Sequence, residues 1–298
     1  MTLLMTLLMT LRTALRMTMR TPLWTLLGAA PFLLPVSANA RQPDASSLPL
    51  WEVGAFGGAV STPAYPGSDD RSARKLILPF LLYRGQVLRS DQSGIGARLL
   101  HTDLVEFDVG FALSLPARSD HVAARRGLPD LGSLIEFGPR LKVKLAEPTP
   151  NRRVRLEAPL RAVMEVKDGL HRQGWAFEPK LVYEIEIDEG LGGWTLDASL
   201  GAVFGSAALN NYFYEVQPQF ATSERAAYRA KSGLMLTRAG LSAWRKLGPD
   251  LRVFGFTRYD HYANAANRDS ALFRQNTGAS VGLGFAWTLR RSEARASQ

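Results

Sequence analysis

The sequence contains no cysteine and only four histidines among its 298 residues. The absence of cysteine excludes disulfides, thiol nucleophiles and zinc–thiolate sites. No pair of histidines has metal-ligand spacing. No glycine-rich phosphate loop follows a strand and opens a helix. The sequence therefore predicts no catalytic, cofactor-binding or metal-binding residues, and no cofactor.

Long apolar runs are also missing after residue 50, so no transmembrane helix is expected there. Near the N-terminus, three arginines without an acid precede the apolar run Pro22–Val36, and a small-residue pattern ends at Ala40. This order predicts a secretory signal peptide over residues 1–40, cleaved after Ala40. The alternative is a membrane anchor, but the run is shorter than the roughly 20 residues of a bilayer span. A start at Met17 or Met19 is an alternative to Met1.

The formal net charge is +9. The basic residues are spread singly along strand-like segments and do not cluster with aromatics on a helix face. No nucleic-acid partner is expected from this distribution.

Alternation with period 2 is the main positive signal. Across Val154–Val166, apolar residues alternate with charged ones such as Arg155 and Glu157. A strand points successive side chains to opposite faces, so one face is apolar and the other charged. A soluble sandwich would bury the apolar faces, whereas a membrane barrel would turn them to lipid. Several runs exceed the usual strand length of about 5 to 6 residues, and this favours the membrane barrel.

The expected strands alternate between short and mostly longer connections, which is typical of outer-membrane barrels with short periplasmic turns. An even number of strands puts both chain ends on the periplasmic side. The strands are expected at 51–60, 74–83, 86–91, 95–101, 104–115, 132–146, 151–166, 173–188, 192–205, 232–246, 251–262 and 275–289. An additional strand at Asn211–Gln217 is an alternative that would change the count.

The predicted fold class is all-β: a single antiparallel transmembrane β-barrel of about 12 strands, after a cleaved signal peptide. The expected order is a signal peptide over 1–40, a short periplasmic lead-in over 41–50, an outer-membrane barrel over 51–289 and a polar tail over 290–298. Aromatic residues near strand ends fit the interface girdles of such barrels. They are Trp51, Tyr83, Trp175, Tyr183, Trp194, Trp244, Tyr259, Tyr262 and Trp287.

The charged faces would point into the barrel, where both signs could pair across strands and fill the lumen, or line a water-filled pore. A largely filled, structural lumen is the default expectation. The cations are Lys142, Lys144, Arg155, Arg161 and Lys180, and the acids are Glu136, Glu157, Glu165, Glu184 and Glu186.

Several segments resemble the MipA/OmpV family of outer-membrane proteins. The segments are Gly54–Gly58 with Pro63–Asp69, Arg126–Leu131 with Glu136–Leu141, Asn210–Tyr214 with Ala227–Ala230, and Gly282–Trp287. The resemblance covers roughly residues 50–289. It implies an outer-membrane barrel with an interaction role, because family members include a scaffold that bridges a lytic murein transglycosylase and a murein synthase. Other members are linked to adhesion or to passage of small solutes, and the resemblance supplies no catalytic residues.

The expected function is therefore an outer-membrane scaffold for murein-remodelling enzymes, whose partners are membrane lipid, a lytic transglycosylase and a murein synthase. A porin-like channel for small solutes is the alternative, followed by a surface adhesin or a barrel enzyme. An omptin-like protease would use Asp69, Asp70, Asp260 and His261, but adjacent residues on a strand point to opposite faces. A calcium site at Ser68–Asp70 lacks further spaced oxygen ligands.

Overall fold

The computed structural model describes residues 48–84, 88–91, 94–114, 116–188, 190 and 192–295. The expected signal peptide over 1–40, its cleavage point, the alternative starts and most of the lead-in lie outside these residues. None of the helices in the described part of the chain has the length and apolar content needed to span a bilayer.

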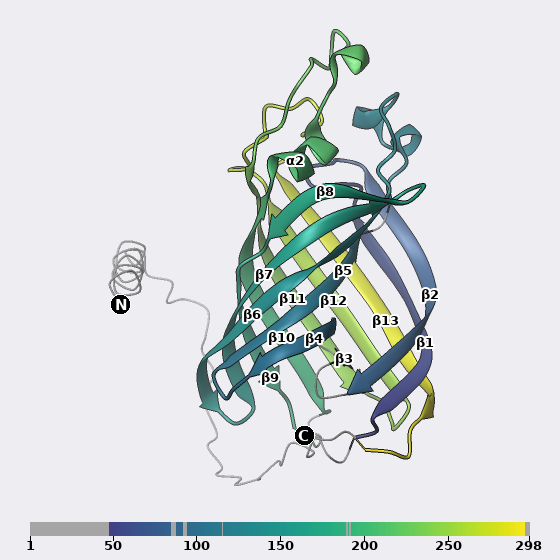
Figure 1. Ribbon diagram of the computed structural model, residues 1–298, viewed down its shortest axis with the longest axis vertical. Helices are drawn as coiled ribbons and strands as arrows, with labels where there is room; N and C mark the ends of the chain where they lie inside the picture. Colours follow the sequence, from purple (N-terminus) through teal and green to yellow (C-terminus); the bar gives the residue numbers. More distant parts are fainter. Residues whose placement is uncertain are drawn as a thin grey trace, which may run out of the picture. The chain divides into compact units, whose positions relative to one another are not determined.

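The described chain is one large antiparallel sheet with short helices in its loops (Figure 1). The strands are β1 Trp51–Pro63, β2 Arg71–Arg84, β3 Leu88–Asp91, β4 Gly94–His101, β5 Val105–Ser114, β6 Ser133–Thr149, β7 Arg152–Val166, β8 Leu170–Phe177, β9 Lys180–Glu186, β10 Trp194–Gly205, β11 Gly233–Lys246, β12 Leu251–His261 and β13 Thr277–Arg291. The helices are the 3-10 turns η2 Ser119–His121, η3 Ala123–Arg125 and η5 Pro218–Phe220, and the α-helix α2 Ala207–Tyr214.

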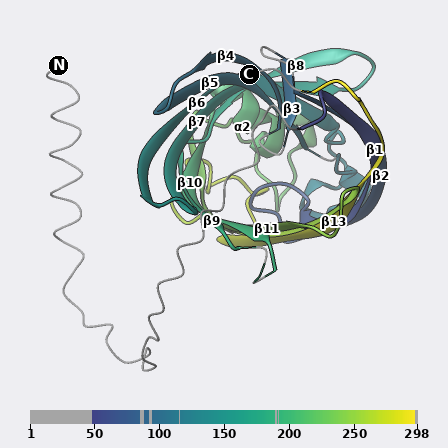
Figure 2. The same cartoon turned by 90° about the horizontal axis from the view of Figure 1, so that it is seen from below.

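The sheet closes on itself. Strand β1 pairs with both β2 and β13, and β11 pairs with both β10 and β12, so the ring of hydrogen-bonded neighbours has no free end. Seen along the barrel, the strands form a ring around an interior (Figure 2). Closure removes the exposed edges that an open sheet presents. The predicted antiparallel β-barrel is confirmed.

Strands β8 and β9 share one position in the ring. Both pair with β7 on one side and with β10 on the other. The break between them falls at Glu178 and Pro179, where proline has no N–H to donate to the ladder. With these two counted as one interrupted strand, the described residues form 12 strand positions. This agrees with the prediction, although a continuous strand was expected over 173–188.

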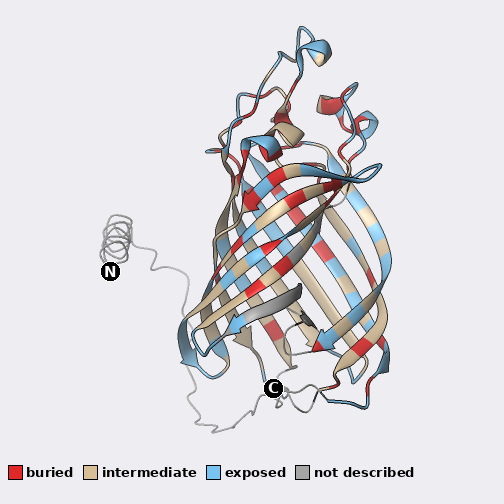
Figure 3. Ribbon diagram, in the orientation of Figure 1, coloured by how far each residue is buried: buried red, intermediate tan, exposed pale blue. Residues whose placement is uncertain are grey.

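Buried and exposed residues alternate along the strands (Figure 3). The exposed positions are mostly large and apolar, and they include Ile77 (83% exposed), Leu200, Leu241 and Leu283. The buried positions of the same strands are largely charged or polar. This is the reverse of a soluble protein, and it matches strands whose outer face meets lipid.

The segment Asn211–Gln217 is not an additional strand. Its first half belongs to α2, which begins after Ser206, whose side-chain oxygen accepts a hydrogen bond from the Leu209 amide (3.2 Å). This is the usual N-cap arrangement. Among the predicted girdle aromatics, Trp175, Tyr259 and Trp287 are exposed on the outer face. Tyr262 is 1% exposed and packs among the loops, so its placement in a girdle is wrong.

Candidate functional site

Ion pairs cover the inner face of β5 to β12, and we call this surface the charged wall. The pairs are Asp108 with Arg140 (2.7 Å) and Lys142 (3.1 Å), Glu106 with Lys142 (2.8 Å), Glu157 with Arg155 (2.8 Å) and Lys180 (3.2 Å), Glu184 with Arg155 (2.7 Å) and Arg153 (3.1 Å), Glu186 with Arg153 (2.8 Å), Arg161 with Glu136 (2.8 Å) and Glu178 (2.6 Å), and Arg238 with Glu178 (3.3 Å) and Asp260 (2.7 Å). The predicted cross-strand pairing is confirmed for most of these residues.

Two predicted members of the charged wall behave differently. Lys144 pairs with Glu147 (3.0 Å) near the exposed end of β6. Glu165 meets no cation within ion-pair distance in the described residues. Its carboxylate accepts hydrogen bonds from the Gly132 amide (2.9 Å), the Tyr212 hydroxyl (3.0 Å) and the Gln173 amide group (2.9 Å). Glu165 therefore joins the wall of the barrel to the loops above it.

The long connections pack together at one end of the barrel, and we call this structure the cap. It consists of residues 64–70, 116–132, 206–232 and 262–276. Its apolar core contains Tyr65, Val122, Leu131, Leu209, Tyr214, Ala230, Tyr262 and Ala265. Burial of these side chains holds the loops in place. The segments that carry the family resemblance, Pro63–Asp69, Arg126–Leu131 and Asn210–Tyr214, meet here.

Hydrogen bonds to backbone carbonyls tie the cap loops to one another. The Tyr65 hydroxyl donates to Leu272 O (2.5 Å), and the Tyr214 hydroxyl donates to Pro66 O (3.0 Å). The Arg125 guanidinium donates to Phe213 O (2.9 Å). Each bond joins two different loops, so the cap is one packed unit.

Burial shifts the titration of the cap side chains. It raises the pKa of Tyr65 to about 12, because the charged phenolate is poorly solvated there. Burial also lowers the pKa of Arg125. The Arg125 guanidinium carbon lies 5.7 Å from the centroid of the Tyr65 ring. The pKa of Tyr212 is raised by burial and by the nearby Glu165 carboxylate. Packing and hydrogen bonds hold these side chains in place, and their positions indicate a structural role.

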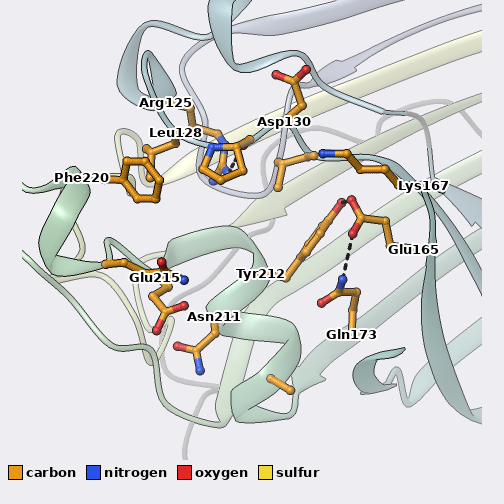
Figure 4. Close-up of a pocket in the computed structure, with 14 residues that line it drawn as sticks. Arg125, Leu128, Asp130, Glu165, Lys167, Gln173, Asn211, Tyr212, Glu215 and Phe220 are labelled. Atoms are coloured by element: carbon orange, nitrogen blue, oxygen red, sulfur yellow. Dashed lines mark hydrogen bonds between the residues drawn. The ribbon is translucent and has the colours of Figure 1, made fainter. Parts of the chain in front are cut away.

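An open pocket of about 410 Å³ lies between the 116–132 loop, α2 and the ends of β7 and β8 (Figure 4). Its polar side chains include Asp130, Glu165, Lys167, Gln173 and Glu215, and its apolar side includes Leu128, Tyr212 and Phe220. The pocket is therefore lined by acidic and basic side chains and has one apolar side.

Each of the acids considered for catalysis has another partner in the structure. Both oxygens of Asp260 are held by Arg238 (2.7 and 3.0 Å), and His261 is exposed on the opposite face of β12. Asp70 accepts a hydrogen bond from the Ala123 amide (2.7 Å), and Asp69 lies 3.7 Å from Arg274. Among the described residues, no group of three acidic or histidine side chains could hold a metal ion.

A family model described as MltA-interacting protein MipA matches residues 53–289. The chain belongs to the MipA family. It is an outer-membrane β-barrel, in agreement with the expected family, fold and location. No curated protein sequence matches the chain.

Solved structures with a similar trace are also outer-membrane proteins. A bacterial polysaccharide outer membrane secretin is 8% identical, with a TM-score of 0.42 over 80% of this chain and 98% of that one. An outer membrane channel from Pseudomonas putida F1 is 13% identical, with a TM-score of 0.46 over 84% and 99%. Outer membrane phospholipase A from Escherichia coli is 7% identical, with a TM-score of 0.34 over 82% and 95%. The fold of this MipA-family chain is established by its own strand pairing.

The sequence did not predict the cap as a packed unit. Its core residues are dispersed over four loops without periodicity, so no local pattern marks them. Two signals were present: Ser206 as an N-cap residue, and the aromatic run Tyr212–Tyr214 in a segment placed outside the barrel.

Proposed function

We propose that this MipA-family barrel is a non-enzymatic scaffold that holds murein-remodelling enzymes at the inner surface of the outer membrane. The observation that carries the proposal is the match of residues 53–289 to a family described as interacting with MltA. The partners would be a lytic murein transglycosylase and a murein synthase. Such enzymes work in the periplasm, so the scaffold must present its binding surface at the periplasmic rim.

The rim with the short turns is the expected periplasmic side. The segments that flank the first and last strands meet there, since Leu50 N donates to Ala294 O (2.8 Å) and Arg84 N donates to Leu50 O (2.7 Å). The last residues of β6 carry the partly exposed ion pair of Lys144 and Glu147 at the same rim. Exposed charges at a rim guide association with a partner and set its specificity.

Capture of the two enzymes by the immobilised, detergent-solubilised protein tests the proposal. Glu147→Lys reverses a charge at the rim, and Asp120→Lys reverses an exposed charge in the cap as the matched control. We expect Glu147→Lys to reduce retention of the transglycosylase or the synthase, and Asp120→Lys to leave it unchanged. If wild-type protein retains neither enzyme, the scaffold proposal is wrong.

A pore for small solutes is a second candidate. It is favoured by side chains such as Leu78, which point to the interior and yet stay 46% exposed. Planar-bilayer recordings test it, and the absence of any conductance would remove it.

A further inference from the structure

The inner face of the barrel has a second, apolar side. It consists of Phe56 on β1, Leu76, Leu78 and Phe80 on β2, and Phe254 and Phe256 on β12, and we call it the apolar wall. Directly opposed residues of neighbouring strands share a face, and Phe56 is opposite Leu78 while Gly54 is opposite Phe80. This face also carries the buried Glu52, whose carboxylate pairs with Arg84 (2.6 Å) and Arg252 (3.0 Å). The apolar wall therefore faces the interior.

Glycines of β13 leave room for the phenylalanine rings of the apolar wall. Strand β13 places Gly282 and Gly284 on the inner face between β12 and β1. A Cβ atom at Gly284 would come within 2.6 Å of the Phe254 ring, so the ring occupies the space of the missing side chain. The Phe56 and Phe254 rings then stack across β13, with centroids 5.3 Å apart. The two rings therefore lie over the glycine positions of β13.

Water reaches this apolar surface. Leu78 points inward and is 46% exposed, whereas the core side chains of the cap are almost fully buried. Exposed apolar patches rimmed by polar groups usually mark binding sites, because their contact with water is unfavourable.

Cations without a carboxylate partner stand at the cap end of the apolar wall. The Arg258 guanidinium lies 4.7 Å from the Phe256 ring centroid and is exposed to the interior. Asp260, the nearest acid on its strand, is held by Arg238 through both oxygens. Arg74 donates to Ser72 Oγ (3.2 Å) and Pro116 O (2.7 Å). In the described residues, neither arginine has a carboxylate within ion-pair distance.

We infer that the apolar wall and Arg258 form a binding site for a small amphipathic anion, an apolar or aromatic body that carries one carboxylate. The body would lie on Phe56, Leu78 and Phe254, and the carboxylate would accept hydrogen bonds from the Arg258 guanidinium. Charge complementarity selects an anion, because Arg258 is a cation. The acids Glu178 and Asp260 of the charged wall are already paired with Arg161 and Arg238. The site is separate from the rim proposed to bind murein enzymes, so it goes beyond the scaffold function.

Calorimetric titration of the full-length mature protein in lipid nanodiscs tests the inference, with empty nanodiscs as the reference. The probes are phenylbutyrate, phenylbutylamine with the same body and opposite charge, and acetate without the body. Arg258→Gln removes the cation, and Leu78→Asn makes the apolar wall polar at an exposed position. The matched control is Arg126→Gln, which removes an exposed arginine from the cap. A mobility shift on boiling verifies that each variant is folded.

We expect phenylbutyrate to bind saturably, and phenylbutylamine and acetate to bind at least about tenfold more weakly. Arg258→Gln should weaken phenylbutyrate binding by about tenfold, the usual scale of a charge-assisted hydrogen bond. Leu78→Asn should also weaken it, and Arg126→Gln should leave it unchanged. Equal affinity for the acid and the amine, heats equal to those of empty nanodiscs, or unchanged binding in both interior variants would overturn the inference. Enzyme capture at the rim would be unaffected by any of these outcomes.

Discussion

At the scale of single residues, Arg161 illustrates what the charged wall contributes. Its guanidinium pairs with Glu136 (2.8 Å) and Glu178 (2.6 Å), and all three side chains are largely buried. Removing one partner from a buried ion pair leaves an uncompensated charge, which costs more than the pair itself gains. The wall therefore depends on every charge keeping its partner.

Arg161→Met should lower the free energy of unfolding by roughly 2–3 kcal/mol, because among the described residues Glu136 would keep only the Ser114 hydroxyl as a partner. Urea unfolding in lipid vesicles measures this change. Arg118→Met, which breaks an exposed pair with Asp120, should lower the free energy of unfolding much less, because water screens that pair. Equal losses for the two variants would show that the interior pairs are as weak as surface pairs.

Ionisation of the Tyr65 hydroxyl should destabilise the cap at high pH. Its pKa rises to about 12 on folding, from about 10 in an unfolded chain. The raised pKa stabilises the folded cap. This stabilisation is fully present below about pH 10 and is lost as the pH rises from about 10 to about 12. Titration by tyrosinate absorbance and near-ultraviolet circular dichroism should show the cap loosening in that window.

Tyr65→Phe is the matched variant for that titration. It removes the ionisable group and the hydrogen bond to Leu272 O but keeps the ring. The alkaline transition should then move to higher pH. A transition that stays at the same pH would mean that Tyr65 does not control it.

At the scale of elements, α2 packs closely on β8 because β8 has a glycine, Gly174, at the point of contact. Gly174 has a φ of +113°, and a Cβ atom there would lie 2.9 Å from the Leu209 backbone nitrogen. Gly174→Ala should therefore displace α2, at a cost of about 1–3 kcal/mol. Limited proteolysis of the 206–232 loop should become faster, while the mobility shift on boiling is retained.

Gly248→Ala provides the comparison, since no atom of the described residues lies within 4 Å of the added Cβ. This variant should be digested at the wild-type rate. If Gly174→Ala also shows the wild-type rate, the close approach does not hold α2 in place.

The strands were predictable from sequence because each carries its own signal. In β7, apolar residues such as Leu156 and Leu160 alternate with Arg155 and Glu157, and this pattern is local. The cap was not predictable, because Tyr65 meets Leu272 only after the barrel has brought the two loops together. The apolar wall was missed for the same reason. Phe56 and Phe254 belong to strands that β13 separates, and the two rings stack only once the barrel has closed.

At the scale of the whole molecule, the barrel and the cap are held by different interactions. The ladder of β10 and β11 runs from Trp194 opposite Arg245 to Gly205 opposite Gly233, below the loop that joins them. The hydrogen bonds that close the barrel between β10 and β11 are therefore separate from the contacts of the cap core. The rim proposed to bind partners lies at the opposite end of the strands from the cap.

Replacing residues 207–230 with a short glycine–serine linker separates the two parts. We expect the shortened protein to reach the outer membrane and to shift in mobility on boiling, because every strand pair remains. Capture of the transglycosylase or synthase should be unchanged, whereas ion conductance should rise as the cap is opened. Loss of the mobility shift would show that the cap is needed to close the barrel. Loss of capture in a folded variant would move the partner site from the rim to the cap.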